Sequence, residues 1–487
     1  MKNASIQPII GFRLALGCIA FFVACGITAV VSAQATTNRT IRVVCYNIMD
    51  DINGFTTPLA GLIAPFGGGG FTEFSSGTVT NGGVLEGIGE EIVGTDPAQP
   101  IDILALEETT SNTTTVQPIV NALNTFYSQS NPSASNMYAM SAYQATEEGG
   151  IITNGNGPNA MVYNTTTLQL VASVSVDPPG GTSHLGSASG EYREVMRYLF
   201  APAGVTPTTT NEFYMYVSHY KAKQEVSDEV LRQGEATIIR TNSATLPSNA
   251  RILYVGDYNV SSNNEPAFQT IVAPGINQGI DPLNPTNVTP EQWDLNSMLS
   301  LKSETATALE WRFDIQIMTS NVYYGLPGGL AYVPGTYHIF GNNGTTPYEK
   351  SVNNGSNTAL NSDLAPGSTI TAAQLYQYLT GASDHLPMVA DYSIPIPVQT
   401  TNASSFLVTS IVQTNSSDIF VMWATTGGTT NVVQVNPGDV NGSYTTNFTD
   451  LSSDIIIQGS GNISTNYLDA GGATNFPSRY YRIRLQP

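Results

Sequence analysis

A small set of polar residues follows apolar runs of the sequence, each near the point where a run ends. They are Asn47, Glu107, Glu108, His219, Asp257, Asn259, Asp314, Asp384 and His385. All belong to the types that ligate metals, transfer protons or donate hydrogen bonds to phosphate. Carboxylates and an amide suit a hard cation such as Mg²⁺, whereas imidazole and thiolate would favour Zn²⁺. These residue types therefore favour a magnesium site at the ends of strands.

The apolar runs have the length and composition of β-strands. Strands are predicted at 41–46, 101–106, 160–163, 212–217 and 251–255. Helices are predicted at 116–127 and 227–242, the second with Ser227 and Asp228 as its caps. The apolar positions expected for this second helix are Val230, Leu231, Ala236, Ile238 and Ile239. Strands interspersed with helices predict a layered α/β domain.

Five short motifs occur in a fixed order. They are Val-Cys-Tyr-Asn at 44–47, Asp-Ile-Leu-Ala-Leu-Glu-Glu at 102–108, Gly-Asp-Tyr-Asn at 256–259, Arg-Phe-Asp at 312–314 and Ser-Asp-His-Leu-Pro at 383–387. This set resembles that of the endonuclease/exonuclease/phosphatase superfamily, which includes pancreatic-type deoxyribonucleases, abasic-site endonucleases, bacterial sphingomyelinases and inositol-phosphate phosphatases. The resemblance implies a four-layered α/β sandwich, in which two packed, mainly antiparallel sheets are flanked by helices.

The resemblance also implies how a metal and a base are held. Glu108 would ligate the catalytic Mg²⁺, Asn47 would bind or orient the ion, and Asp384 would lie close by; Mn²⁺ or Ca²⁺ are the alternatives. His385 would be the general base that deprotonates the attacking water, and Asp314 would orient its ring. A histidine held by a carboxylate has a suitable proton affinity near neutral pH.

The remaining motif residues would handle the phosphate. By the same resemblance, Asp257 and Asn259 would position the phosphate and assist the leaving group, while His219 would donate to a phosphate oxygen in the transition state. Arg193 would contact the phosphate. Outside this context, a lone histidine is more often structural, and Gly-Asp-Xaa-Asn is a common turn.

One motif departs from the family pattern. Glu107 stands where the family usually has glutamine before the metal-binding glutamate. Glu108 takes the ligand role by register, but successive residues of a strand face opposite ways, so an error of one residue would exchange the two.

The N-terminus has the order of a secretory signal peptide. Lys2 and Arg13 precede an apolar stretch at 14–31, and Ala33 ends a small-residue cleavage site. Residues 1–33 are therefore predicted to be removed, with an uncleaved membrane anchor as the alternative. Cys45 is then the only cysteine left, so no internal disulfide can form. This pattern predicts a secreted or cell-surface protein of bacterial type, extracellular or periplasmic.

Beyond the signal, the chain divides into a catalytic domain at 40–393, a linker at 394–403 and a β-rich domain at 404–487. The linker is predicted from the proline-containing run at 393–397. Alternating runs at 418–423 and 480–485 indicate a small all-β sandwich, loosely similar to immunoglobulin or fibronectin modules, which we expect to contact a surface. The chain is expected to be a monomer. The glycine-rich region at 51–100 is predicted to be a long insertion that shapes access to the site.

The predicted function is hydrolysis of a phosphodiester, with extracellular nucleic acid as the preferred substrate and no sequence specificity. The chain is acidic, with a net charge of −20, but seven basic residues fall between Arg193 and Arg251 and could follow a phosphate backbone. The enzymatic alternatives are a sphingomyelinase or phospholipase C-like activity and a phosphomonoesterase. The non-enzymatic alternative is a surface-binding protein on the same scaffold. No Walker loop or Gly-Xaa-Ser-Xaa-Gly elbow occurs.

Overall fold

We analysed a computed structural model of the chain. The structure describes residues 36–49, 83–93, 97–142, 158–176, 193, 195–287, 289–366, 368, 370–397, 407–414, 417–438, 443, 447–458, 462–474 and 478–486. The predicted signal peptide at 1–33 lies outside the described residues, as does most of the predicted insertion at 51–100. Among the described helices, none combines the length and the apolar character needed to cross a membrane.

The first sheet is built around the parallel pair β1 and β2. Within the described chain its order is β11, β13, β1, β2, β4, β3, with β12 also beside β13. The strands are β1 Thr36–Asn47, β2 Ile103–Glu107, β3 Tyr138–Met140, β4 Ala160–Asn164, β11 Ala331–Tyr332, β12 His338–Ile339 and β13 Met388–Pro397. Asn47 pairs with Glu107, so the polar ends of β1 and β2 lie at one edge.

The second sheet is built around β7 and β8. Its order in the described chain is β5, β6, β7, β8, β10, β9. The strands are β5 Leu168–Val176, β6 Val195–Pro202, β7 Phe213–His219, β8 Ile252–Asp257, β9 Gly279–Ile280 and β10 Asp314–Thr319. β7 and β8 are parallel, with His219 opposite Asp257, and β10 runs antiparallel to β8, with Asp314 opposite Asp257. Three polar residues therefore share one edge of this sheet.

The two sheets pack face to face over a common apolar core. Buried side chains of β1 and β2 join those of β7 and β8 in one cluster, which includes Val43, Leu104, Met215 and Leu253. Gln316 of β10 reaches across, because its Nε2 donates to the carbonyl of Val43 over 3.1 Å. The strands predicted from the sequence are all found within a few residues of their expected bounds.

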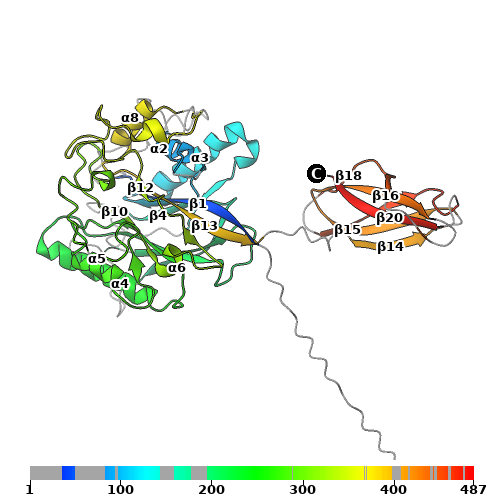
Figure 1. The fold of residues 1–487 in the computed structure, drawn as a ribbon, viewed down its shortest axis with the longest axis horizontal. Helices are drawn as coiled ribbons and strands as arrows, with labels where there is room; N and C mark the ends of the chain where they lie inside the picture. Colours follow the sequence, from blue (N-terminus) through cyan, green and yellow to red (C-terminus); the bar gives the residue numbers. More distant parts are fainter. Residues whose placement is uncertain are drawn as a thin grey trace, which may run out of the picture. The chain divides into compact units, whose positions relative to one another are not determined.

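Helices cover the outer faces of the two sheets (Figure 1). Helices α2 Gly83–Glu90, α3 Gln117–Ser130 and α8 Ala372–Ala382 pack on the first sheet. Helices α4 Val226–Ser243 and α5 Pro266–Val272 pack on the second, where Ile239 and Phe268 meet Ile252 and Ile315. The short helices α6 Ser320–Tyr323 and α7 Ala359–Asp363 lie in connecting segments. The predicted four-layered sandwich is confirmed.

Helix α4 differs in detail from its prediction. Its capping pair is Glu225 with Asp228, whose Oδ2 accepts from the backbone N–H of Glu225 over 3.3 Å, so Ser227 is not the cap. Val230 is 60% exposed, whereas Arg232 and Glu235 are buried. The inward face carries these two charged residues because each has buried partners on neighbouring segments, and Val230 is left facing solvent.

The C-terminal unit is a small β structure of two sheets. One holds β14 Leu407–Gln413, β15 Ile419–Thr426 and β19 Asn462–Asp469. The other holds β16 Thr430–Gly438, β17 Thr449–Asp450, β18 Ile455–Ile456 and β20 Ser478–Gln486. Val421, Trp423 and Val433 form its buried centre. The predicted runs at 418–423 and 480–485 correspond to β15 and β20.

The predicted linker begins too early. Residues 394–397 belong to β13, where Ile394 pairs with Arg39 and Pro397 pairs with Thr36. Alternating prolines hold the backbone extended, and an extended backbone suits a strand as well as a linker. The pair formed by β1 and β13 thus extends to Thr36 and Pro397, and 398–403 lie outside the described residues.

Candidate active site

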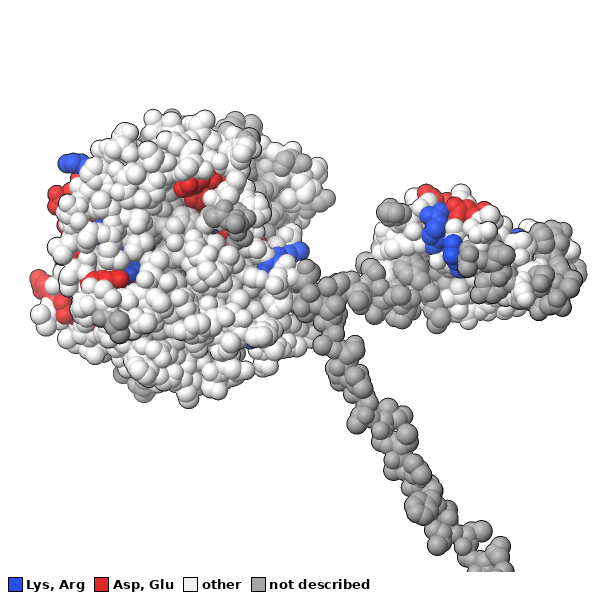
Figure 2. Space-filling model, in the orientation of Figure 1, with Lys and Arg blue, Asp and Glu red and all other residues white. Residues whose placement is uncertain are grey.

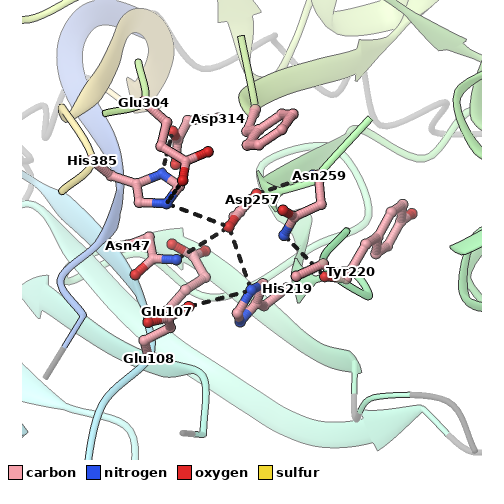
Figure 3. Close-up of polar contacts among 12 residues, drawn as sticks. Asn47, Glu107, Glu108, His219, Tyr220, Asp257, Asn259, Glu304, Asp314 and His385 are labelled. Atoms are coloured by element: carbon pink, nitrogen blue, oxygen red, sulfur yellow. Dashed lines mark hydrogen bonds and ion pairs between the residues drawn. The ribbon is translucent and has the colours of Figure 1, made fainter. Parts of the chain in front are cut away.

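The predicted site residues come together where strands of both sheets end (Figure 3). The first sheet contributes Asn47 and the Glu107-Glu108 pair, and the second contributes His219 and Asp257. Parallel strands place their carboxyl ends at the same edge, which is why side chains far apart in sequence meet here. Antiparallel β10 brings its first residue to this edge too.

A close approach of β7 and β8 depends on Gly256. This glycine has φ +144°, and a Cβ built on it would lie 1.7 Å from the carbonyl oxygen of Ser218. Any side chain there would push the two strands apart. Since His219 and Asp257 follow these positions directly, the glycine fixes the spacing of two site residues.

His385 is held from one side by Asp314. Its Nδ1 lies 2.8 Å from Asp314 Oδ2, and both residues are buried. The backbone N–H of His385 donates to Ser383 Oγ over 3.0 Å, and that hydroxyl donates to the carbonyl of Asn47 over 2.7 Å. The ring is therefore fixed, with Nε2 directed toward the other carboxylates of the site.

Asp257 lies at the centre of the cluster. Its Oδ2 accepts from Asn47 Nδ2 over 3.1 Å and lies 3.4 Å from His219 Nε2 and 3.7 Å from His385 Nε2. Its Oδ1 accepts from the backbone N–H of Asn259 over 3.0 Å. One carboxylate thus connects both histidines and the amide of β1.

Glu107 and Glu108 have different surroundings. Glu107 is fully buried, and the thiol of Cys45 lies 3.4 Å from its Oε1. Glu108 has φ +58°, and its Oε1 lies 3.5 Å from His219 Nε2. The left-handed backbone at Glu108 ends the alternation of the strand. Glu108 is therefore the member of the pair that lies beside His219, and its role as a metal ligand stays a prediction.

The cluster has the donor set of a divalent cation site. Carboxylate oxygens of Glu108 and Asp257 lie within 4.8 Å of each other. Burial raises the pKa of Glu108 to about 8 and the pKa of Asp257 to about 6, although His385 and Asn47 oppose this rise. Buried carboxylates with raised pKa values lack enough positive charge around them. A bound cation would supply it, so the residues fit the predicted metal.

The two histidines of the site have opposite pKa shifts. Burial lowers the pKa of His385, but Asp314, Asp257 and Glu304 outweigh burial and hold this pKa well above its usual value. Burial, reinforced by the positive charge of Arg193, holds the pKa of His219 well below its usual value. The neutral form of His219 is therefore favoured, and a neutral imidazole can donate one N–H.

Asp384 and Asn259 lie at the margins of the cluster. The side chain of Asp384 is 36% exposed, and its Oδ1 lies 4.0 Å from His385 Nε2. Asn259 has φ +51°, and its Nδ2 donates to the carbonyl of Tyr220 over 3.1 Å. The metal role of Asp384 and the phosphate role of Asn259 stay predictions.

Arg193 supports the backbone of the site. It is 3% exposed, and its Nη1 donates to the carbonyl of Tyr220 over 2.6 Å and lies 3.4 Å from the carbonyl of His219. Its backbone N–H donates to Glu235 Oε1 over 2.9 Å. These contacts place Arg193 behind the His219 segment, and its contact with phosphate stays a prediction.

Three of the seven basic residues between Arg193 and Arg251 are withdrawn from the surface. Arg193, Arg232 and Arg251 are 3%, 0% and 6% exposed. Arg232 pairs with Glu265, and Arg251 donates to the carbonyls of Leu326 and Pro327. Figure 2 shows few Lys or Arg atoms on the visible face of the catalytic unit. These guanidinium groups bind carbonyl and carboxylate oxygens of residues that are distant from them in the sequence.

Glu304 and Tyr220 belong to the site and were missed in the sequence. Glu304 lies beside His385 and Asp384, and its ligand atoms are within 4.8 Å of theirs. Tyr220 follows His219 directly and accepts bonds from Arg193 and Asn259. Glu304 follows no apolar run, so it carried no signal of a strand end.

Comparisons with known proteins gave structural matches only. No protein-family model and no curated protein matches the chain. Among solved structures, the human Nocturnin catalytic domain with bound sulfate is similar with a TM-score of 0.39 and 14% identity, over 74% of this chain and 97% of that one. An endonuclease/exonuclease/phosphatase family protein from Bacteroides thetaiotaomicron is similar with a TM-score of 0.38 and 12% identity, over 73% and 98%. D. rerio TDP2 complexed with a single-strand DNA product is similar with a TM-score of 0.38 and 12% identity, over 72% and 98%.

These TM-scores lie below 0.5, and we draw the function from the side chains of the site. Asp257 has His385 and Asp314 on one side and His219 and Glu108 on the other. Together these side chains can hold a cation, accept a proton and donate a hydrogen bond to an anion.

Proposed function

We propose that this chain is a metal-dependent phosphodiester hydrolase. The observation that carries the proposal is the fixed ring of His385, with Nδ1 bonded to Asp314 and Nε2 facing the carboxylates of Asp257, Glu304 and Asp384. A base oriented in this way beside a cation site suits the activation of water against an anionic ester.

The site residues divide the work of hydrolysis. Asn47, Glu108 and Asp257 would hold Mg²⁺, with Asp384 nearby; when bound, the ion supplies positive charge that neutralises phosphate oxygens. Nε2 of His385 takes a proton from water as the water oxygen bonds to phosphorus. The bond from phosphorus to the leaving oxygen breaks with its electron pair, and that oxygen then takes a proton from solvent. Neutral His219 donates its N–H to an equatorial oxygen, where negative charge builds up.

The raised pKa of His385 is compatible with this role. Asp314, Asp257 and Glu304 raise this pKa, and a cation at Glu108 and Asp257 would neutralise the second of these carboxylates. Cation binding would therefore lower the pKa of His385 toward its usual value and leave the ring free to accept a proton.

For the substrate we propose nucleic acid, bound without sequence specificity outside the cell. Two features of the sequence support this choice, the signal-like N-terminus and the motif set at 44–387. The buried arginines lower the expected electrostatic attraction, so we expect a weaker salt dependence than a basic nuclease shows. A monomeric state and surface contact through the C-terminal unit are further proposals from the sequence.

The test is a substrate panel with the full chain. Duplex DNA, RNA, sphingomyelin, a phosphomonoester and bis(p-nitrophenyl) phosphate are each assayed with Mg²⁺ and with EDTA. We expect Mg²⁺-dependent cleavage of the nucleic acids and the chromogenic diester. Cleavage of sphingomyelin or of the monoester alone would replace the nucleic-acid proposal. Cleavage that survives EDTA, or no cleavage of any phosphate ester, would overturn the hydrolase proposal and leave a binding protein.

A further inference from the structure

Glu304 occupies a rigid place in the candidate site. Its backbone is paired on one side with Trp311, which donates to the Glu304 carbonyl over 2.7 Å. On the other side it forms a bridge with His385, next to the 2.7 Å bond from the N–H of Leu386 to the carbonyl of Ser303. The segment that carries His385 and the segment that carries Glu304 are therefore fixed against each other.

The side chain of Glu304 faces the reactive nitrogen of His385 (Figure 3). Its Oε1 lies 4.0 Å from His385 Nε2, opposite to the ring nitrogen that Asp314 holds. Its Oε2 is buried and has no hydrogen-bond partner among the described residues, and the side chain as a whole is 20% exposed. A buried carboxylate oxygen without a partner is costly, so a group that completes it is expected.

The spacing around Nε2 fits one shared water molecule. The 4.0 Å separation is too long for a direct hydrogen bond. Two groups that share a water lie about 4 to 5 Å apart, because each bond to the water is about 2.8 Å long. Asp257 Oδ2 lies 3.7 Å from the same nitrogen, so polar groups surround the space on two sides.

We propose that Glu304 orients the attacking water together with His385. The carboxylate accepts one O–H of the water while Nε2 of His385 takes the other proton, so that the lone pair of the oxygen points at phosphorus. As the new P–O bond forms, the bond to the leaving oxygen breaks and the electron pair leaves with it. This inference rests on the proposed hydrolase function and adds a residue to it.

The rival role for Glu304 is that of a metal ligand with Asp384. The ligand atoms of Glu304, Asp384 and His385 lie within 4.8 Å of one another, and a carboxylate pair can hold a cation. The two roles differ in what a variant changes. Loss of a ligand raises the Mg²⁺ concentration needed for activity, whereas loss of water orientation lowers kcat at saturating Mg²⁺.

The experiment compares Glu304→Gln, Glu304→Asp and the matched control Glu310→Gln in the full chain. Glu310 lies in the same loop, and its Oε1 accepts from the hydroxyl of Tyr348 over 3.4 Å, away from His385. Each variant is assayed on bis(p-nitrophenyl) phosphate across a Mg²⁺ titration, and its thermal midpoint is recorded. Glu304→Gln keeps the shape of the side chain, and Glu304→Asp keeps its charge.

We expect Glu304→Gln to lower kcat about 10- to 100-fold, with KM and the half-saturating Mg²⁺ concentration within about threefold of wild type. Glu304→Asp should have a kcat between those of wild type and Glu304→Gln. If Glu304→Gln does not fold, the kcat of Glu304→Asp tests the inference in its place. Glu310→Gln should match wild type.

Two results would overturn the inference. Both Glu304 variants could keep kcat within twofold, or the half-saturating Mg²⁺ concentration could rise tenfold or more in Glu304→Gln. If wild type itself shows no Mg²⁺-dependent hydrolysis, or if His385→Ala is as active as wild type, the proposed function fails instead. If wild type is active, His385→Ala is inactive and the Glu304 variants have the wild-type kcat, only the proposed role of Glu304 is refuted.

Discussion

The His385 side and the His219 side of the candidate site differ in charge although both are buried. His385 is 4% exposed and His219 is 2% exposed. The pKa of His385 is raised well above its usual value, whereas the pKa of His219 is lowered well below it. The same side chain at the same depth thus has opposite pKa shifts on the two sides of Asp257.

The difference comes from neighbouring charges. His385 contacts Asp314 and faces Asp257 and Glu304, so its positive form is favoured. Burial favours the neutral form of His219, and the positive charge of Arg193 behind it reinforces this effect, with no carboxylate outweighing burial. One side of the site is therefore suited to exchange protons and the other to donate a fixed N–H. Groups whose pKa values are driven apart in this way mark an acid–base division of roles.

The substitution with the largest expected effect removes the negative charge of Asp257, the carboxylate that lies between the two histidines. Asp257→Asn should lower kcat by about 10³-fold, because Asp257 contacts both histidines and Asn47. The measurement is kcat on bis(p-nitrophenyl) phosphate at saturating Mg²⁺. Asp363→Asn, which changes a carboxylate bonded to Ser362, should keep the wild-type kcat. A loss below tenfold in Asp257→Asn would show that the two sides work independently.

The neutral state of His219 predicts a graded series. His219→Gln keeps a neutral N–H near the position of Nε2 and should lower kcat about tenfold, whereas His219→Ala should lower it about 10²- to 10³-fold. Both variants are assayed as above, with thermal midpoints to verify folding. Equal losses in the two variants would mean that His219 transfers a proton, and the contrast with His385 would then be wrong.

The prediction with the smallest expected effect concerns a third histidine, His338, which lies outside the candidate site. His338 Nε2 lies 2.9 Å from Glu91 Oε2, in a pair whose histidine side chain is 23% exposed. Burial lowers the pKa of His338, but Glu91 outweighs burial and the net pKa is raised. His338 lies in β12.

A raised pKa in the folded state stabilises the protein at low pH. The contribution is fully present below the unfolded-state pKa of about 6.5 and is lost as the pH rises through the higher folded-state value. His338→Gln should therefore lower the free energy of unfolding by about 1 kcal/mol more at pH 6 than at pH 9. Urea midpoints of wild type and variant at the two pH values give the result, and a deficit that grows with pH would contradict it.

The positions of the strands and of their ends could be predicted from the periodicity of the sequence. The strands that precede Asn47, His219 and Asp257 alternate or are continuously apolar, so their ends could be found. Because strands of one sheet end together, the residues at these ends could be expected to meet, and they do. Periodicity did not place Asp314 beside His385; that pairing was implied by the resemblance of the motif set, and the structure shows it at 2.8 Å.

The sequence could not predict what depends on tertiary contacts. The orientation of Glu108 rests on a backbone φ of +58°, which no residue pattern near it requires. Glu304 lies on a segment held by isolated bridges to Trp311 and His385, without a strand of its own. Arg232 and Arg251 resemble surface residues in sequence, but their partners, Glu265 and the carbonyls of 326–327, come from other segments. Partners from other segments decided the cases of Glu304, Arg232 and Arg251.

The most direct test of the central claim compares two histidines of this chain. His385→Ala and His338→Ala are assayed beside wild type on bis(p-nitrophenyl) phosphate at saturating Mg²⁺, with thermal midpoints measured for all three. The account predicts that His385→Ala loses at least about 10³-fold in kcat while His338→Ala stays within about threefold of wild type. A folded His385→Ala protein with wild-type kcat would contradict the assignment of His385 as the base and, with it, the active site proposed here.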